Sequence, residues 1–102
     1  MNKGWYVTDG FPYVLDLTDC RDWDDLHGRI RMLFAFPDYY GRNWNAMWDC
    51  LCNLFRKDDC GEIVIRGTET MPKEMKEDID DLKEVFDDLC TKRCPRIVLR
   101  FE

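Results

Sequence analysis

Ile63-Val64-Ile65 is a continuous apolar run near the middle of the sequence, flanked by Glu62 and Arg66. The run lacks the alternation of apolar and polar residues that marks a strand with one solvent-exposed face. Such a run is typical of a strand that is buried on both faces in a parallel sheet. We therefore expect a parallel sheet with helices covering both of its sides.

Two further runs, residues 12–17 and 96–101, are short and rich in strand-forming side chains. Three helical patterns lie between the runs, with apolar residues recurring every three or four positions over residues 23–36, 43–55 and 70–94. The resulting order is strand, helix, helix, strand, helix, strand. It predicts an α/β fold with a small three-stranded parallel sheet, joined by right-handed crossovers.

The ends of the first two helices are marked by capping and breaking residues. Candidate N-caps for the first helix are Thr18, Asp19 and Asp22. Pro37 requires that helix to stop near Phe36, and Asn43 is placed to cap the second helix. The segment between them has no period and holds Tyr39 and Tyr40, so we expect a loop that presents two tyrosines.

A chain of 102 residues is in the size range of one domain, and 45% hydrophobic residues with 14% aromatics provide a core. We expect residues 1–11 to be an N-terminal extension and residues 12–102 to be a single domain. Folding should need no metal, cofactor or disulfide.

The charge balance is acidic: 21 acidic residues against 15 basic ones give a formal net charge of −6. Such a surface repels phosphate backbones, which argues against direct nucleic-acid binding. It attracts basic proteins, although acidic surfaces also serve solubility alone.

The N-terminal residues lack the apolar core of a secretory signal, and no stretch is long enough to cross a bilayer. We therefore expect a cytoplasmic protein without membrane contact, whose cysteines are reduced thiols. The six cysteines are Cys20, Cys50, Cys52, Cys60, Cys90 and Cys94. Buried, inert thiols are the favoured interpretation. A zinc site is the less favoured alternative, because Cys50 and Cys52 do not have the usual ligand spacing.

Enzymatic interpretations have little support. His27 is the single histidine and lies beside the first helix's apolar stripe, where a hydrogen-bonded structural histidine is the favoured interpretation. A thiol activated by His27 stays open, although nothing selects one cysteine. Asp87 and Asp88 are predicted near the C-terminal end of the third helix, where the dipole disfavours acids; this points to an external cation, with solubility as the alternative explanation.

One segment carries a longer pattern. Its parts are Asp25-Leu26-His27, Phe36-Pro37-Asp38-Tyr39-Tyr40-Gly41, Asn43, Ala46 and Trp48-Asp49-Cys50-Leu51. This pattern closely resembles the barstar family, intracellular inhibitors of barnase-type secreted ribonucleases. The predicted strand and helix order agrees with the fold that this resemblance implies.

The resemblance implies that the second helix and the loop before it enter a ribonuclease active site. Asp49 would stand in for the scissile phosphate and accept hydrogen bonds from cationic side chains. Tyr39 would pack on a catalytic histidine, while Tyr40 and Trp48 would supply aromatic area. The other implied contacts are Asn43 at the start of the helix and Asp88, in a peripheral ion pair.

Three positions depart from the family's best-known pattern: Asn45 replaces a carboxylate, Cys52 a hydroxyl residue and Leu54 a tryptophan. Asn45 and Cys52 remain on the expected contact face beside Asp49. We expect the partner to be a basic ribonuclease other than barnase. We also expect the chain to be monomeric when it is free. The alternative is a barstar-like interaction module that binds another protein through the same face.

Overall fold

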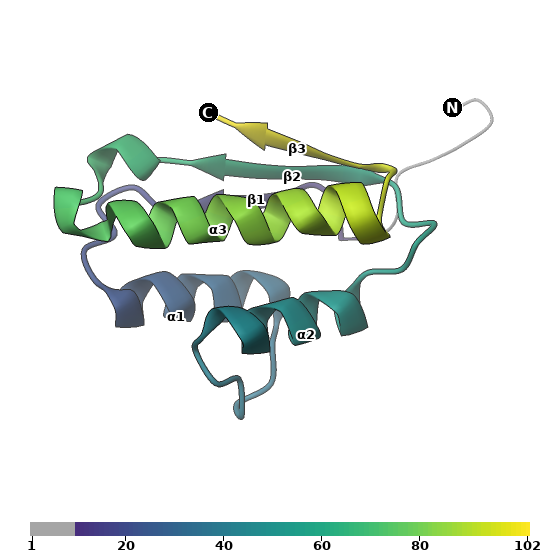
Figure 1. Ribbon diagram of the computed structural model, residues 1–102, viewed down its shortest axis with the longest axis horizontal. Helices are drawn as coiled ribbons and strands as arrows, with labels where there is room; N and C mark the ends of the chain where they lie inside the picture. The colour runs from purple at the N-terminus through teal and green to yellow at the C-terminus, as the bar shows by residue number, and fades with distance from the viewer. Residues whose placement is uncertain (1–9) are drawn as a thin grey trace.

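The computed structural model describes residues 10–102, which form one three-stranded sheet and three α-helices (Figure 1). In chain order the elements are β1 (Tyr13–Asp16), α1 (Trp23–Phe34), α2 (Trp44–Leu54), β2 (Gly61–Arg66), α3 (Lys76–Asp88) and β3 (Ile97–Phe101). Short 3-10 turns at Thr68–Thr70 and Lys73–Met75 precede α3, and a π-helical turn at Leu89–Arg93 follows it. The predicted α/β order of elements is confirmed.

The sheet is parallel, with the strands in the order β1-β2-β3. In register, Val64 of the central strand lies between Val14 and Arg100. Each strand therefore pairs with the next one along the chain, as the predicted crossovers require.

The helices cover one face of the sheet, so the expectation of helices on both sides was wrong. Ile63 and Ile65 are fully buried against the core, whereas Arg66 and Arg100 on the opposite face are exposed. Successive right-handed crossovers that step in one direction place their helices on the same side. Figure 1 shows α1, α2 and α3 together on one side of the strands.

Val64 is the residue that led to the expectation of a second buried face of the sheet. It is 3% exposed although it lies on the open face. The same face carries ion pairs from Arg100 to Glu62 at 3.5 Å and from Arg66 to Glu102 at 3.0 Å. The sequence of β2 therefore resembles that of a strand buried on both faces, although its open face holds one apolar residue flanked by long polar side chains.

The helices join one core through the apolar stripes that their spacing predicted, with α1 beside β1 and α2 beside α3. Leu26 and Ile30 of α1, Leu51 of α2 and Phe86 of α3 are all fully buried. Burying a side chain of this size contributes about 1.5–3 kcal/mol relative to leaving it in water. These stripes hold α1 and α2 at fixed positions relative to each other, and so determine the geometry between them.

Of the three candidate N-caps for α1, Asp22 is the one that caps it, and Asn43 caps α2 as predicted. The Asp22 carboxylate accepts a hydrogen bond from the Asp25 N–H, and the Asn43 side-chain oxygen accepts one from the Ala46 N–H, each at 2.8 Å. The α1 helix ends at Phe34, two residues earlier than predicted, because Ala35 turns into the left-handed region at φ 55°.

The predicted extension, residues 1–11, lies largely outside the described residues. Phe11 is among the described residues, and its ring packs on Tyr13 and Phe55, with centroid separations of 5.1 and 5.4 Å, respectively. No helix among residues 10–102 combines the length and apolar character needed to span a bilayer.

Candidate functional site

The loop between α1 and α2, residues 35–43, is fixed to α1 by side-chain contacts. Asp38 forms an ion pair with Arg31, and Arg42 donates to Asp24 at 3.2 Å. Between these surface pairs, the Tyr40 hydroxyl meets His27 Nδ1 at 2.6 Å. The loop is therefore held at three points along its length.

His27 is the buried anchor of this loop. It is 0% exposed, and its ring packs against both Trp23 and Trp44, with ring centroids 4.1 and 4.8 Å away. Burial, assisted by the nearby Arg42 charge, lowers the pKa of His27 to about 4, so the ring is neutral near pH 7. The favoured interpretation, a hydrogen-bonded structural histidine, is confirmed, and within residues 10–102 His27 bonds a tyrosine rather than a cysteine.

Tyr40 is more buried than a residue expected to offer ring area to a partner. It is 6% exposed, and burial raises the pKa of its hydroxyl above the usual range. A side chain in this position has almost no ring area to offer to another protein. Tyr40 anchors the loop from inside through His27, so a contact between Tyr40 and a partner stays a prediction, whereas the neighbouring Tyr39, 86% exposed, faces solvent.

Asp49 lies at the middle of the exposed side of α2. Its carboxylate is exposed and has no hydrogen bond or ion pair within residues 10–102. Every other side chain of α2 is uncharged, so this single carboxylate sets the charge of the helix face. An uncommitted carboxylate on a rigid helix is available to accept hydrogen bonds from an external cation.

The remaining predicted contacts on α2 differ in accessibility. Asn45 is exposed, whereas Trp48 and Cys52 are half-buried. Burial raises the pKa of the Cys52 thiol. Asn43 uses its side-chain oxygen for the helix cap, and its amide nitrogen donates to the Gly41 carbonyl at 3.2 Å.

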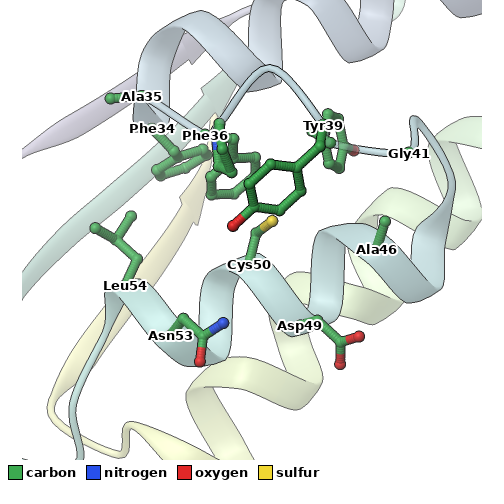
Figure 2. Close-up of a pocket in the computed structure, with 12 residues that line it drawn as sticks. Phe34, Ala35, Phe36, Tyr39, Gly41, Ala46, Asp49, Cys50, Asn53 and Leu54 are labelled. Carbon is green, nitrogen blue, oxygen red and sulfur yellow. The ribbon is translucent and has the colours of Figure 1, made fainter.

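A groove of about 520 Å³ separates the loop from α2. Figure 2 shows the Tyr39 ring leaning over Cys50, with Asp49 and Asn53 projecting side by side from α2. The lining residues are Phe34, Ala35, Phe36, Pro37, Tyr39, Tyr40, Gly41, Ala46, Asp49, Cys50, Asn53 and Leu54. The groove thus combines aromatic walls with a carboxylate and an amide.

Sequence reasoning did not select Asn53 or Cys50 as contact residues. The available signal was helical spacing, since Asn53 is one turn after Asp49 on the same face. Burial raises the pKa of the Cys50 thiol, which gives the floor of the groove a neutral group near pH 7.

Asp88 lies at the end of α3, and its setting differs from the expected one. The chain continues from α3 directly into the π-helical turn, and Lys92 in that turn pairs with Asp88 at 3.4 Å. The dipole cost that hinted at an external cation is thus offset internally. A contact from Asp88 to a partner stays a prediction, and it would compete with Lys92.

Burial disfavours the thiolate form of three further cysteines. Burial raises the pKa of Cys20, of Cys94 and, to about 11, of Cys90. Among the described residues, no group of three or more His, Cys, Asp or Glu side chains is arranged to hold a metal ion.

Comparison with known proteins connects this geometry to a family. The family model described as Barstar (barnase inhibitor) matches residues 11–100. The chain belongs to the barstar family. The match covers the fold from β1 to all but the last residue of β3, including the loop, the groove and Asp49.

One curated relative of this barstar-family chain is the Bacillus subtilis (strain 168) protein named "Putative ribonuclease inhibitor YrdF". The two sequences are 45% identical over 38 residues, which are 37% of this chain and 42% of the relative. The similarity therefore spans less than half of the relative's length.

Proposed function

We propose that this chain inhibits a ribonuclease by inserting the loop and α2 into a cationic active site, where Asp49 takes the place of a substrate phosphate. The observation that carries the proposal is the exposed Asp49 carboxylate, which has no partner within the described residues. Membership of the barstar family and the name of the Bacillus relative support the ribonuclease as the partner class.

The mechanism is steric and electrostatic, and no bond is made or broken. Arginine, lysine and histidine side chains that bind RNA phosphate would donate hydrogen bonds to Asp49. Tyr39, already 86% exposed on an anchored loop, adds rigid ring area beside that charge. Because the anchors hold the loop before binding, little conformational entropy is lost on association.

Asp49→Ala tests this mechanism. Inhibition constants would be measured against barnase and a panel of other small basic bacterial ribonucleases. Removing one partner of a buried, hydrogen-bonded charge pair costs about 2–5 kcal/mol, a general range that is commonly illustrated with the barnase–barstar complex. The affinity for the best-inhibited ribonuclease should therefore fall at least about 30-fold.

Asp49→Asn is the control, because it keeps the shape and removes the charge. It should also weaken inhibition strongly, and both variants should match the parent chain in thermal unfolding. Unchanged inhibition by Asp49→Ala would rule out phosphate mimicry, whereas inhibition of none of the ribonucleases by the parent chain would rule out the partner class.

The second candidate is an interaction module for a protein that is not a ribonuclease. It is favoured by the single charge on α2, where Asn45 stands in place of a second carboxylate. The two candidates are separated by capturing partners from the lysate and secreted fraction of the native host, once with the parent chain and once with Asp49→Ala. The first candidate requires that the partner captured by the parent chain and lost with Asp49→Ala cleaves RNA.

The proposal places the chain in the cytoplasm, where an inhibitor would neutralise a toxic ribonuclease before its export. Fractionation of the native host, with detection of the chain by antibody, tests this placement. Recovery from the culture medium alone would contradict it.

A further inference from the structure

Strand β3 is an edge of the sheet. It pairs with β2 on one side, and Figure 1 shows no other described element beyond its free side. Such an edge presents backbone groups to which another strand can bind. Two of the large hydrophobic side chains that the protein exposes, Val98 at 56% and Phe101 at 45%, also belong to β3. The edge therefore offers both hydrogen-bonding groups and apolar surface to a further strand.

The directions of the backbone groups show which residues can bind such a strand. The Glu102 N–H donates to the Ile65 carbonyl of β2 at 2.9 Å, so the even-numbered residues of β3 turn their backbone groups towards β2. Leu99 and Phe101 turn theirs the other way. Their N–H groups, and the carbonyls of Leu99 and Ile97, are therefore directed out of the sheet edge.

Arg96, the residue before β3, is a cation without an internal partner. Its side chain is exposed and makes no hydrogen bond or ion pair with any described residue. At the other end of the strand, Glu102 pairs with Arg66 at 3.0 Å and with Arg100 at 2.7 Å. Arg96 and Glu102 are on the same face, because they are separated by an even number of positions. The two ends of β3 thus carry complementary charges, an unpaired cation and an acid that can accept further hydrogen bonds.

A second copy of β3, running antiparallel, matches the backbone groups of this edge. About a two-fold axis at Leu99, Ile97 lies opposite Phe101 of the other copy. The Leu99 N–H and carbonyl groups then bond their counterparts across the axis, and each Phe101 N–H reaches an Ile97 carbonyl. All three side chains are on the helix-covered face, so the same register forms apolar cross-strand pairs, which stabilise a sheet.

The charges match in the same register. Arg96 lies opposite Glu102 of the other copy, so Glu102 stands between this arginine and Arg66 of its own chain. Arg100 lies opposite Val98, and its charge is already paired within its own chain. No cation therefore directly faces another cation across the seam, and the unpaired Arg96 gains an acid.

We propose that this chain forms a homodimer through β3, which joins the sheets of two copies into one continuous sheet. The inference goes beyond the proposed function and differs from the sequence-based expectation of a monomer, because no local pattern shows which strand forms the edge. Each copy contributes one short strand, and small interfaces are weak. We expect a dissociation constant of about 1–100 µM.

The dimer leaves the loop and α2 accessible. Figure 1 shows β3 and α2 on opposite sides of the molecule. The two Asp49 carboxylates therefore lie away from the joined edge, and each copy is free to bind its own partner. Dimerisation makes the protein bivalent without changing either site.

Sedimentation equilibrium tests this dimer. The full chain is measured over a concentration range that brackets the expected dissociation constant, under reducing conditions so that the cysteines cannot cross-link. The average mass should rise from that of one chain towards that of two. A mass that stays at one chain across the whole range overturns the proposal.

Arg96→Glu and Arg93→Glu are a matched pair of variants. Both arginines are exposed and have no ion pair among the described residues, but only Arg96 lies in the proposed seam. Arg96→Glu places an acid opposite Glu102, and like charges directly opposite each other destabilise paired strands. It should raise the dissociation constant about tenfold or more, whereas Arg93→Glu should change it by less than a factor of about two. Equal effects of the two variants would overturn the proposal.

Phe101→Pro tests the backbone pairing. Proline removes the outward N–H but no hydrogen bond to β2, and it is tolerated on an edge strand where the N–H faces solvent. This variant should remain monomeric across the range. Circular dichroism and thermal unfolding check that each variant folds, and Arg96→Glu decides alone if Phe101→Pro does not. A dimer as stable in the folded variants as in the parent chain rejects the β3 interface. None of these measurements involves a ribonuclease, so their outcome is independent of the proposed function.

Discussion

His27 links the interior of the protein to its exposed loop. One ring nitrogen bonds the Tyr40 hydroxyl, and the other, Nε2, is buried without a hydrogen-bond partner among the described residues. A second proton would place a charge on a fully buried ring, where water cannot hydrate it. The anchor is therefore strong only while the imidazole is neutral.

The free energy of unfolding should fall as the pH decreases from about 6.5 to 4. In this window the unfolded chain binds a proton at His27, and the folded chain, with its pKa lowered to about 4, does not. The difference amounts to a loss on the order of 3 kcal/mol by pH 4. Urea unfolding monitored by tryptophan fluorescence at several pH values measures it.

His27→Gln is the comparison for this pH dependence. It keeps a polar side chain of similar length but does not titrate, so the slope between pH 6.5 and 4 should become much shallower. Asp16 and Asp25 have lowered pKa values because of hydrogen bonds from Thr18 and Arg29, respectively, and they contribute only at lower pH. An equal slope in both proteins would show that His27 does not control the transition.

Single residues were predicted unevenly from the sequence. The position of Asp49 on the flank of α2 follows from helical spacing, and its exposure agrees with it. Tyr39 and Tyr40 are adjacent residues of one type in a loop without period, so spacing does not show which of them turns inward. The partner of Tyr40, His27, is 13 positions away and meets it only in the folded chain.

At the level of helices, Asn43 connects folding to the site. Its side chain caps α2 two turns before Asp49, and α2 has no acidic residue in its first turn to assist the cap. Asn43→Ala should lower the free energy of unfolding by about 1 kcal/mol, and Asn43→Gly by only a few tenths. Chemical denaturation of the two variants measures both changes, and equal losses would contradict the capping role.

Helix positions were easier to predict than the coverage of the sheet. Capping residues and apolar stripes are local signals, so α1 and α2 were placed to within two residues at each end. The coverage of the sheet depends on the order of its strands, which no local pattern contains. The apolar run around Val64 therefore predicted a second layer of helices that the structure does not have.

The third helix shows the same limit. Its apolar stripe was recognised correctly, with Leu82 and Phe86 fully buried, but the pattern merged 3-10, α and π segments into one helix. The π-helical turn moves the end of the helical backbone to Arg93, and Lys92 and Arg93 lie in its last turn. Spacing alone does not distinguish these hydrogen-bond patterns, so the internal partner of Asp88 was missed.

Across the molecule, the negative charge is distributed unevenly. The α2 helix carries one acid, whereas α3 carries seven acidic residues and two lysines within Lys76–Asp88. Most of the attraction towards a basic partner therefore comes from beside the site rather than from within it. Charges of this kind accelerate encounter more than they stabilise the complex.

Asp81→Asn combined with Asp87→Asn tests this division of roles. Both residues are exposed on α3, and neither lines the groove. The association rate with a basic ribonuclease at low salt should fall about threefold or more, while the dissociation rate stays within a factor of about two. Surface plasmon resonance at several salt concentrations measures both rates, and a change confined to dissociation would place these acids in the contact.

The arrangement of sheet and helices also separates the site from the last strand. In Figure 1 the end of β3 lies at the opposite side of the molecule from α2 and its loop. A linker attached after Glu102 would therefore project away from the groove. Immobilised on a solid support in this orientation, the chain would leave Tyr39 and Asp49 open to the medium and serve as a capture reagent for its partner.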